Sequence, residues 1–219
     1  MRLQPKTVAV IVAHPDDETL WAGGMILSHP QWQCFVVTLC RASDAERVPK
    51  FYQTLRRLGA NGIMGDLDDG PEQCALDDAI VEETVINSLP PVHLDLVLTH
   101  GPAGEYTRHR RHEETCRAVV HLWSANRLPT EAVWMFAYED GDGPYLPRLE
   151  QAAHRRLALA DDIWQQKYRI ITEIYGFAPA SWEAETTPQQ EAFWCFNDPA
   201  AAEEFVRERA RERENPITV

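Results

Sequence analysis

Short apolar runs alternate with amphipathic segments along the first two thirds of the chain. Apolar runs of strand length occur at 8–13, 34–40, 63–64, 94–99 and 132–137. Helical periodicity is predicted between them, at 19–28, 46–58, 77–89 and 110–127. Runs that are apolar at every position are typical of strands buried on both faces of a parallel sheet. The pattern therefore predicts a three-layer α/β fold with a mainly parallel sheet.

The pattern changes after about residue 147. Residues 148 to 175 have helical periodicity, 193–196 form a candidate late strand, and the residues from 199 onward form a charged helix that we interpret as a solvated face. We predict a single domain over 1–219. Its α/β core, 1–147, carries the site, and its C-terminal part, 148–219, is helical with one late strand.

The charge and composition of the chain limit the kinds of molecule that it is expected to bind. The formal net charge is -13, and residues 58–107 contain ten acidic residues and no Lys or Arg, which argues against nucleic acid or an anionic membrane as a partner. The five cysteines form no C-x-x-C pair, no apolar run is long enough to span a membrane, and no signal peptide is recognised at the start. We expect a cytoplasmic protein with a small-molecule partner, and leave open whether it forms a homo-oligomer.

The first apolar run ends abruptly in polar residues. Val8 to Ala13 is followed by His14-Pro15-Asp16-Asp17-Glu18. One interpretation is a helix start that is capped by acidic residues. However, charges beside a buried strand are costly unless they are paired or bound to a metal. The position of the cluster, at the carboxyl end of a central strand, therefore indicates a ligand site.

Other polar segments are expected at the same edge of the sheet. The loops that follow parallel strands lie together, which brings 41–44, 66–69 and 100–112 next to the first cluster. His109 and His112, three apart at a helix start, project on roughly the same side. These two imidazoles can share a metal, or divide metal binding and proton transfer between them. Loops 66–71, 138–144 and 176–187 are expected to shape the pocket.

The ligand types favour a catalytic metal. Nitrogen and oxygen ligands with an open position describe a catalytic zinc site better than a structural one, although Fe(II) or Co(II) can use the same ligands. Adjacent residues cannot easily both reach one ion. One of Asp16 and Asp17 should therefore bind the metal, while the other acts on water.

Two motifs carry a family resemblance. The string A-H-P-D-D-E at 13–18, together with G-E-Y-x-x-H-x-x-H at 104–112, resembles the LmbE/PIG-L family of zinc-dependent N-deacetylases. The resemblance implies a Rossmann-like fold. It also implies a hydrolase that removes an acetyl or other acyl group from the amide nitrogen of an N-acetylglucosamine-type or related small substrate.

The same resemblance assigns roles to the motif residues. It implies that His14, Asp17 and His112 bind zinc and that Asp16 is the general base. It implies that His109 polarises the carbonyl or stabilises the oxyanion, as a protonated imidazole can.

The second motif departs from the family pattern. Many members have Gly-His-Pro-Asp-His where this chain has T-R-H-R-R-H at 107–112. The histidine spacing is kept, but Arg108, Arg110 and Arg111 change the local charge. They either favour an acidic or phosphorylated substrate group or lie on a solvated helix.

Candidate substrate-binding residues surround the predicted metal. Glu105, Tyr106 and Arg108 belong to the second motif. Arg41 can bind a substrate hydroxyl or anion, or form a salt bridge with the acidic loop. Asp69 can contact sugar hydroxyls, orient a metal-binding histidine or simply form a turn.

An alternative function uses the same crevice without hydrolysis, as a small-molecule or nucleotide-binding module. No G-x-G-x-x-G follows the first strand, which argues against nucleotide binding. Retention of all the predicted metal ligands also argues against a catalytically silent relative.

Overall fold

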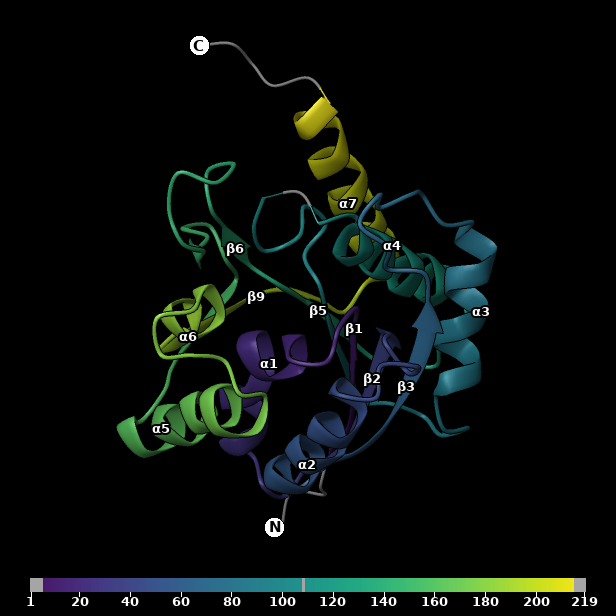
Figure 1. Cartoon of the computed structure of the whole chain (residues 1–219). Helices are drawn as coiled ribbons and strands as arrows, with labels where there is room; N and C mark the ends of the chain where they lie inside the picture. Colours follow the sequence, from purple (N-terminus) through teal and green to yellow (C-terminus); the bar gives the residue numbers. More distant parts are fainter. Residues whose placement is uncertain (1–5, 108, 215–219) are drawn as a thin grey trace, which may run out of the picture.

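Seven strands form one sheet in the order β3-β2-β1-β4-β5-β9-β8 (Figure 1). The structure, a computed structural model, describes residues 6–107 and 109–214. The strands of this sheet are β1 (Thr7–Val12), β2 (Gln33–Cys40), β3 (Asn61–Leu67), β4 (Leu96–Thr99), β5 (Val133–Phe136), β8 (Arg155–Ala158) and β9 (Gln190–Phe196). The first five are parallel, and β9 and β8 are antiparallel to their neighbours. A separate ribbon pairs β6 (Tyr138–Glu139) with β7 (Arg148–Leu149).

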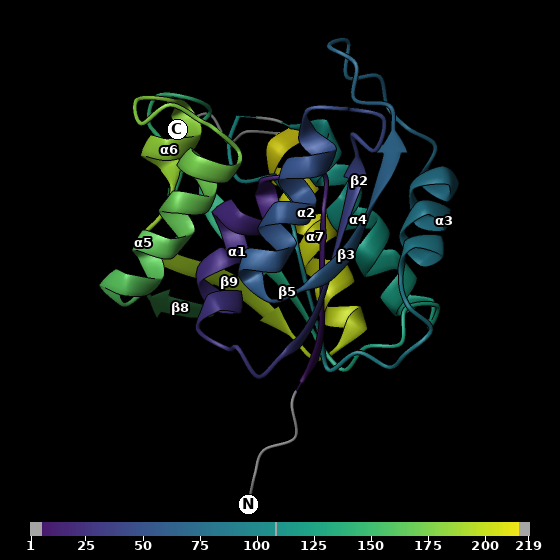
Figure 2. The same cartoon turned by 60° about the horizontal axis from the view of Figure 1, so that its bottom comes forward.

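Helices cover both faces of this sheet. The helical segments are α1 (Asp17–Leu27), α2 (Arg47–Leu58), α3 (Asp78–Ser88), α4 (Arg110–Ser124), α5 (Asp161–Arg169), the π-helix η1 (Ile170–Ile174), α6 (Trp182–Thr186) and α7 (Pro199–Glu214). Figure 2 shows α1, α2 and α5 on one face and α3, α4 and α7 on the other. The predicted three-layer fold with a mainly parallel sheet is therefore confirmed. Within the described ranges, no helix is long and apolar enough to cross a membrane.

Strand β1 lies at the centre of the sheet and is buried on both faces. Val8, Val10 and Val12 pack into the core beneath α1 and α2, whereas Ala9 and Ile11 pack into the core beneath α3 and α4. All five are fully buried, as expected for alternating side chains of a strand between two helical layers. The uninterrupted apolar run at the start of the chain is therefore explained by its place in the fold.

The C-terminal part differs from the prediction of a helix over 148–175. Arg148–Leu149 forms β7, Arg155–Ala158 forms β8, and the helix begins only at Asp161. β8 is an edge strand that pairs with β9, and this tertiary pairing overrides a local sequence that suits a helix equally well. The predicted late strand is confirmed, and it is longer than expected at its N-terminal end.

A buried ion pair within the C-terminal part also contacts α1. Glu191 of β9 and Lys167 of α5 are fully buried and 2.7 Å apart. The two carboxylate oxygens of Glu191 also accept hydrogen bonds from the backbone N–H groups of Gly24 and Met25, each at 2.7 Å. This close approach favours a residue without a side chain at 24, because a Cβ there would lie 2.4 Å from the Leu159 methyl groups and 2.9 Å from the buried Glu191 carboxylate.

We expect Gly24→Ala to lower the free energy of unfolding by about 1–3 kcal/mol, the usual cost of overpacking a core. Gly23→Ala is the matched control, because its nearest contact would be at 3.3 Å with Thr19. That variant should stay within about 1 kcal/mol of the wild type, as alanine favours a helix. Urea unfolding of both variants measures the difference. Equal stabilities would contradict this explanation of Gly24.

Candidate functional site

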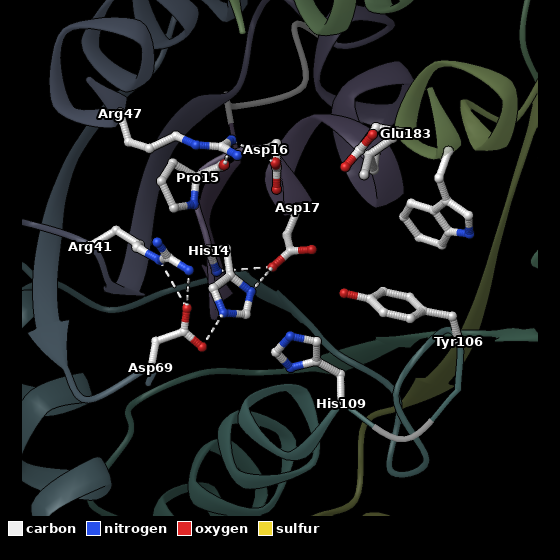
Figure 3. Close-up of a pocket in the computed structure, with 12 residues that line it drawn as sticks. His14, Pro15, Asp16, Asp17, Arg41, Arg47, Asp69, Tyr106, His109 and Glu183 are labelled. Atoms are coloured by element: carbon white, nitrogen blue, oxygen red, sulfur yellow. Dashed lines mark hydrogen bonds and ion pairs between the residues drawn. The ribbon is translucent and has the colours of Figure 1, made fainter. Parts of the chain in front are cut away.

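The order of the strands places the first polar cluster at a switch point. From β1 the chain steps outward to β2 and β3, and it then returns to place β4 on the other side of β1. Ligands of open α/β sheets bind in the crevice that such a reversal creates. A cavity of about 150 Å³ lies there (Figure 3). It is lined by His14, Pro15, Asp16, Asp17, Leu20, Arg41, Arg47, Asp69, Tyr106, His109, Trp182 and Glu183.

Three ligand atoms form a nearly equilateral triangle at the base of this crevice. Nδ1 of His14 lies 3.2 Å from Oδ2 of Asp17 and 3.3 Å from Nε2 of His112. The third side, from His112 to Asp17, is also 3.3 Å. In tetrahedral zinc sites with bonds of about 2.0–2.1 Å, ligand atoms lie about 3.3 Å apart. The triangle therefore has the dimensions of one face of a tetrahedral metal site.

Two carboxylates orient the imidazoles of this triangle. Nε2 of His14 lies 3.1 Å from Oδ1 of Asp69, and Nδ1 of His112 lies 2.6 Å from Oε2 of Glu105. When each imidazole donates its N–H to its carboxylate, its other nitrogen presents a lone pair to the centre of the triangle. Lone pairs facing one another repel unless a cation lies among them. Carboxylate–histidine pairs of this kind accompany most histidine ligands of metals in proteins.

His100 completes this network behind the triangle. The backbone N–H of Ala13 donates to Nε2 of His100 at 2.9 Å, so that nitrogen is an acceptor. Nδ1 of His100 therefore carries the proton and donates to Glu105 at 2.8 Å. Although burial alone would raise the pKa of Glu105, the imidazoles of His100 and His112 lower it to about 2. Glu105 is thus an anion whose position is fixed from two sides.

Three other groups of side chains in the described part of the chain have ligand atoms close enough for a metal, and in two of them the chemistry is less suitable. In the group of His14, Cys40 and Asp69, burial raises the pKa of the Cys40 thiol to about 12, and a thiol must lose its proton to bind a metal. In the group of Asp17, His100 and His112, the Ala13 N–H already occupies the His100 nitrogen.

Asp16 lies beside the triangle in an unusual backbone conformation. Its φ angle is +125°, which residues other than glycine rarely adopt. Its carboxylate accepts a hydrogen bond from Arg47 at 2.9 Å, and its backbone N–H donates to Glu18 at 3.0 Å. Burial and the neighbouring Asp17 carboxylate raise the pKa of Asp16 to about 8, against the opposing effect of Arg47. Asp16 is a pocket-lining acid that is held at both its backbone and its side chain.

His109 and Tyr106 form the opposite wall of the pocket (Figure 3). Burial and the nearby imidazoles of His112 and His14 lower the pKa of His109 to about 3. A pKa this low favours the neutral imidazole, whereas the role that the resemblance implies is one that a protonated imidazole can fill. Its Nδ1 is buried and has no hydrogen-bond partner among the residues that the structure describes. The group of His14, His109 and His112 also has ligand atoms within reach of one ion.

The predicted substrate-binding residues occupy different environments. Tyr106, Arg41 and Asp69 line the cavity, and Arg41 forms the salt bridge with the acidic loop that was one of its two expected roles, at 2.6 Å from Asp69. The Glu105 side chain is fully buried, and its carboxylate is engaged by His100 and His112. Arg108 lies outside the described residues.

Arg111, one of the three arginines of the second motif, is only 2% exposed. It donates to the backbone carbonyls of Asp68 and Cys74 and pairs with Glu114. It therefore supports the loop that carries Asp69 and is not part of a solvated helix face.

Arg47, Glu18 and His100 were assigned no main role from the sequence. Glu18 is the last residue of the first motif, and the resemblance assigned it no role. Arg47 belongs to an amphipathic helix, where one more charged residue is unremarkable. Trp182 and Glu183 lie in the segment 176–187 that was expected to shape the pocket, and both line it.

We expect Glu105→Gln to weaken zinc binding by about 10–100-fold, the usual effect of losing a carboxylate that orients a histidine ligand. The two imidazoles donate to Oε2 of Glu105 and the Gly101 N–H donates to Oε1. An amide has one acceptor oxygen and no negative charge, so it cannot accept from all three donors. Competition with a chromophoric chelator measures the affinity. Glu83→Gln, an exposed change on α3, is the control and should bind zinc like the wild type. Unchanged affinity in Glu105→Gln would contradict the orienting role.

Comparison with known proteins supports the assignment of the fold. No family model matches the chain. An uncharacterised protein of Acanthamoeba polyphaga mimivirus is 21% identical over 183 residues, which cover 77% of this chain and 75% of that protein. N,N'-diacetylchitobiose deacetylase from Pyrococcus horikoshii superimposes with a TM-score of 0.63 at 16% identity, covering 88% of this chain and 84% of its own.

Two further solved structures share this fold. A zinc-inhibited form of teicoplanin deacetylase has a TM-score of 0.62 at 15% identity, covering 88% of this chain and 98% of its own. The 4-carboxy-2-hydroxymuconate hydratase from Pseudomonas putida has a TM-score of 0.54 at 16% identity, covering 98% of this chain and 90% of its own. The Rossmann-like fold implied by the resemblance to LmbE/PIG-L deacetylases is confirmed. Fold and site together describe an α/β protein with a histidine–aspartate cluster that can hold a metal ion.

Proposed function

We propose that this chain is a metal-dependent hydrolase that removes an acetyl or related acyl group from the amide nitrogen of a small substrate of the N-acetylglucosamine type. Zinc is the proposed metal, with His14, Asp17 and His112 as its ligands. The observation that carries the proposal is the triangle of ligand atoms, with sides of 3.2, 3.3 and 3.3 Å. Its size suits a tetrahedral ion and leaves a fourth position for the reaction.

The residues around the triangle suit acyl transfer to water. A bound zinc ion would supply Lewis-acid chemistry, which lowers the pKa of water and polarises a carbonyl group. Asp16 takes the proton of the attacking water as general base, since its carboxylate lines the same cavity. His109, across the cavity, donates an N–H to the oxygen that gains negative charge, a role that a neutral imidazole can fill.

The rest of the pocket suits a polar substrate. Arg41 lies at its rim, where 46% of its side chain is exposed although Asp69 occupies part of its guanidinium. The remaining N–H groups of Arg41 can donate hydrogen bonds to sugar hydroxyl groups. The ring of Trp182, 4.6 Å from that of Tyr106, provides an apolar surface against which a sugar ring can pack.

Release of a primary amine tests the proposal, because the fold is also that of a hydratase and does not select the reaction. Zinc-loaded protein is incubated with N-acetylglucosamine, N,N'-diacetylchitobiose and other N-acetylated amino sugars. Free amine and acetate should appear in equal amounts, and a chelator should stop the reaction. Asp17→Asn should lose both zinc and activity. Failure to bind any divalent metal, or metal binding without amine release from the whole panel, would contradict the proposal.

A further inference from the structure

Asp16 needs external support to stay in its conformation. A φ angle of +125° is strained for a residue with a side chain and persists only where the surroundings enforce it. The carbonyl of Asp16 accepts the first hydrogen bonds of α1, from Thr19 and Leu20, each at 2.9 Å. Its N–H donates to Glu18 and its carboxylate accepts from Arg47. Glu18 and Arg47 therefore hold the two sides of Asp16 that the helix leaves free.

Glu18 is in turn held by a residue far along the chain. The Glu18 side chain is fully buried, and its Oε2 accepts the Asp16 N–H. Its Oε1 accepts hydrogen bonds from the Thr19 hydroxyl at 2.6 Å and the Tyr175 hydroxyl at 2.9 Å. Tyr175 is 2% exposed and does not line the cavity. Its hydrogen bond to Glu18 connects its hydroxyl to the acceptor of the Asp16 N–H.

The same segment also supports Arg47. The ring of Phe177, two residues after Tyr175, lies 5.0 Å from the Arg47 guanidinium carbon. Gly176 between them has a φ angle of +82°, which turns the chain so that these neighbours reach different partners. The segment directly follows the π-helix η1, an irregular element that is frequent near functional sites. One short stretch of the C-terminal part thus contacts both residues that hold Asp16.

We infer that Tyr175 is a positioning residue, which acts through Glu18 to keep the Asp16 carboxylate aligned with the site. The inference rests on the proposed function, in which Asp16 is the general base. Removing the Tyr175 hydroxyl leaves Oε1 of Glu18 with one donor fewer and loosens the acceptor of the Asp16 N–H. Misalignment should affect the proton transfer and leave substrate binding largely unchanged.

Tyr175→Phe tests this inference when kcat and KM are measured separately. We expect kcat to fall about 10-fold, with KM and zinc content within twofold of the wild type, because even a small misplacement of a catalytic group is costly. Tyr168→Phe is the matched control, since that ring lies in the same helical region and packs against Trp164. Its kcat should be unchanged. Thermal unfolding of both variants separates lost stability from lost alignment.

A double-mutant cycle shows whether Tyr175 acts through Glu18. In a Glu18→Gln background the added Tyr175→Phe change should lower kcat by less than twofold, because residues in one network are not additive. If the double variant lowered kcat by the product of the two single effects, or if Tyr175→Phe kept the wild-type kcat, the inference would be overturned. Amine release by the wild type is measured first. Its absence would refute the proposed function, whereas an active wild type with a fully active Tyr175→Phe variant refutes only the role of Tyr175.

Discussion

Asp16→Asn should lower kcat for amine release by about 10²–10⁴-fold, the range attributed to a positioned general base. Asparagine keeps the size of the side chain and a carbonyl oxygen for Arg47, and it is among the residues that best tolerate a positive φ angle. The fold and the metal ligands should therefore be retained. We expect zinc content and the melting temperature to stay close to those of the wild type.

The control for this variant makes the same chemical change outside the pocket. Asp142 is exposed and also has a positive φ angle, +63°, so Asp142→Asn repeats the chemical change at another residue with a positive φ angle. It should retain full activity. If Asp16→Asn released amine at the wild-type rate with its zinc in place, Asp16 would not be the base.

Lys167→Met should lower the free energy of unfolding by about 3–5 kcal/mol, the cost of leaving one partner of a buried ion pair alone. Glu191 would keep its two backbone hydrogen bonds to α1. However, its charge would lie in a fully buried position without a counterion. Because burial already lowers the pKa of Lys167, the pair is a costly arrangement, and it becomes more costly when the cation is removed.

Lys50→Met is the matched surface control for this measurement. Lys50 of α2 pairs at 2.6 Å with Glu46, the residue that precedes the helix. The Glu46 side chain is 79% exposed. Exposed pairs of this kind contribute about 0.2–1 kcal/mol. Chemical denaturation of the two variants should therefore separate them by several kcal/mol. A loss below 1 kcal/mol in Lys167→Met would show that Glu191 does not need this counterion for the stability of the fold.

The sequence was most informative about the central sheet. A run without polar positions, such as Val8 to Ala13, has few alternatives to a strand covered on both faces. Once the strands are parallel, their carboxyl ends share one edge, which is why His14 and His112 were predicted to meet. The edge strand β8 was missed, because Arg155–Ala158 becomes a strand only by pairing with β9.

The supporting residues of the site were the hardest to predict. Glu105 lies in the second motif, but the sequence does not tell whether its carboxylate faces substrate or the back of His112. Arg47 and Tyr175 reach the site only through three-dimensional packing, and no local pattern marks them. Motif residues are thus predictable from their chemistry, and Asp69 was among the residues considered for orienting a histidine, whereas the contacts of Arg47 and Tyr175 are visible only in the folded protein.

Anomalous scattering at the zinc edge, from crystals grown with zinc, tests the metal site most directly. We predict one strong peak within about 2.0–2.2 Å of Nδ1 of His14, Oδ2 of Asp17 and Nε2 of His112, the bond lengths usual for zinc. A peak at His14, Cys40 and Asp69, or none in this crevice, would contradict the account.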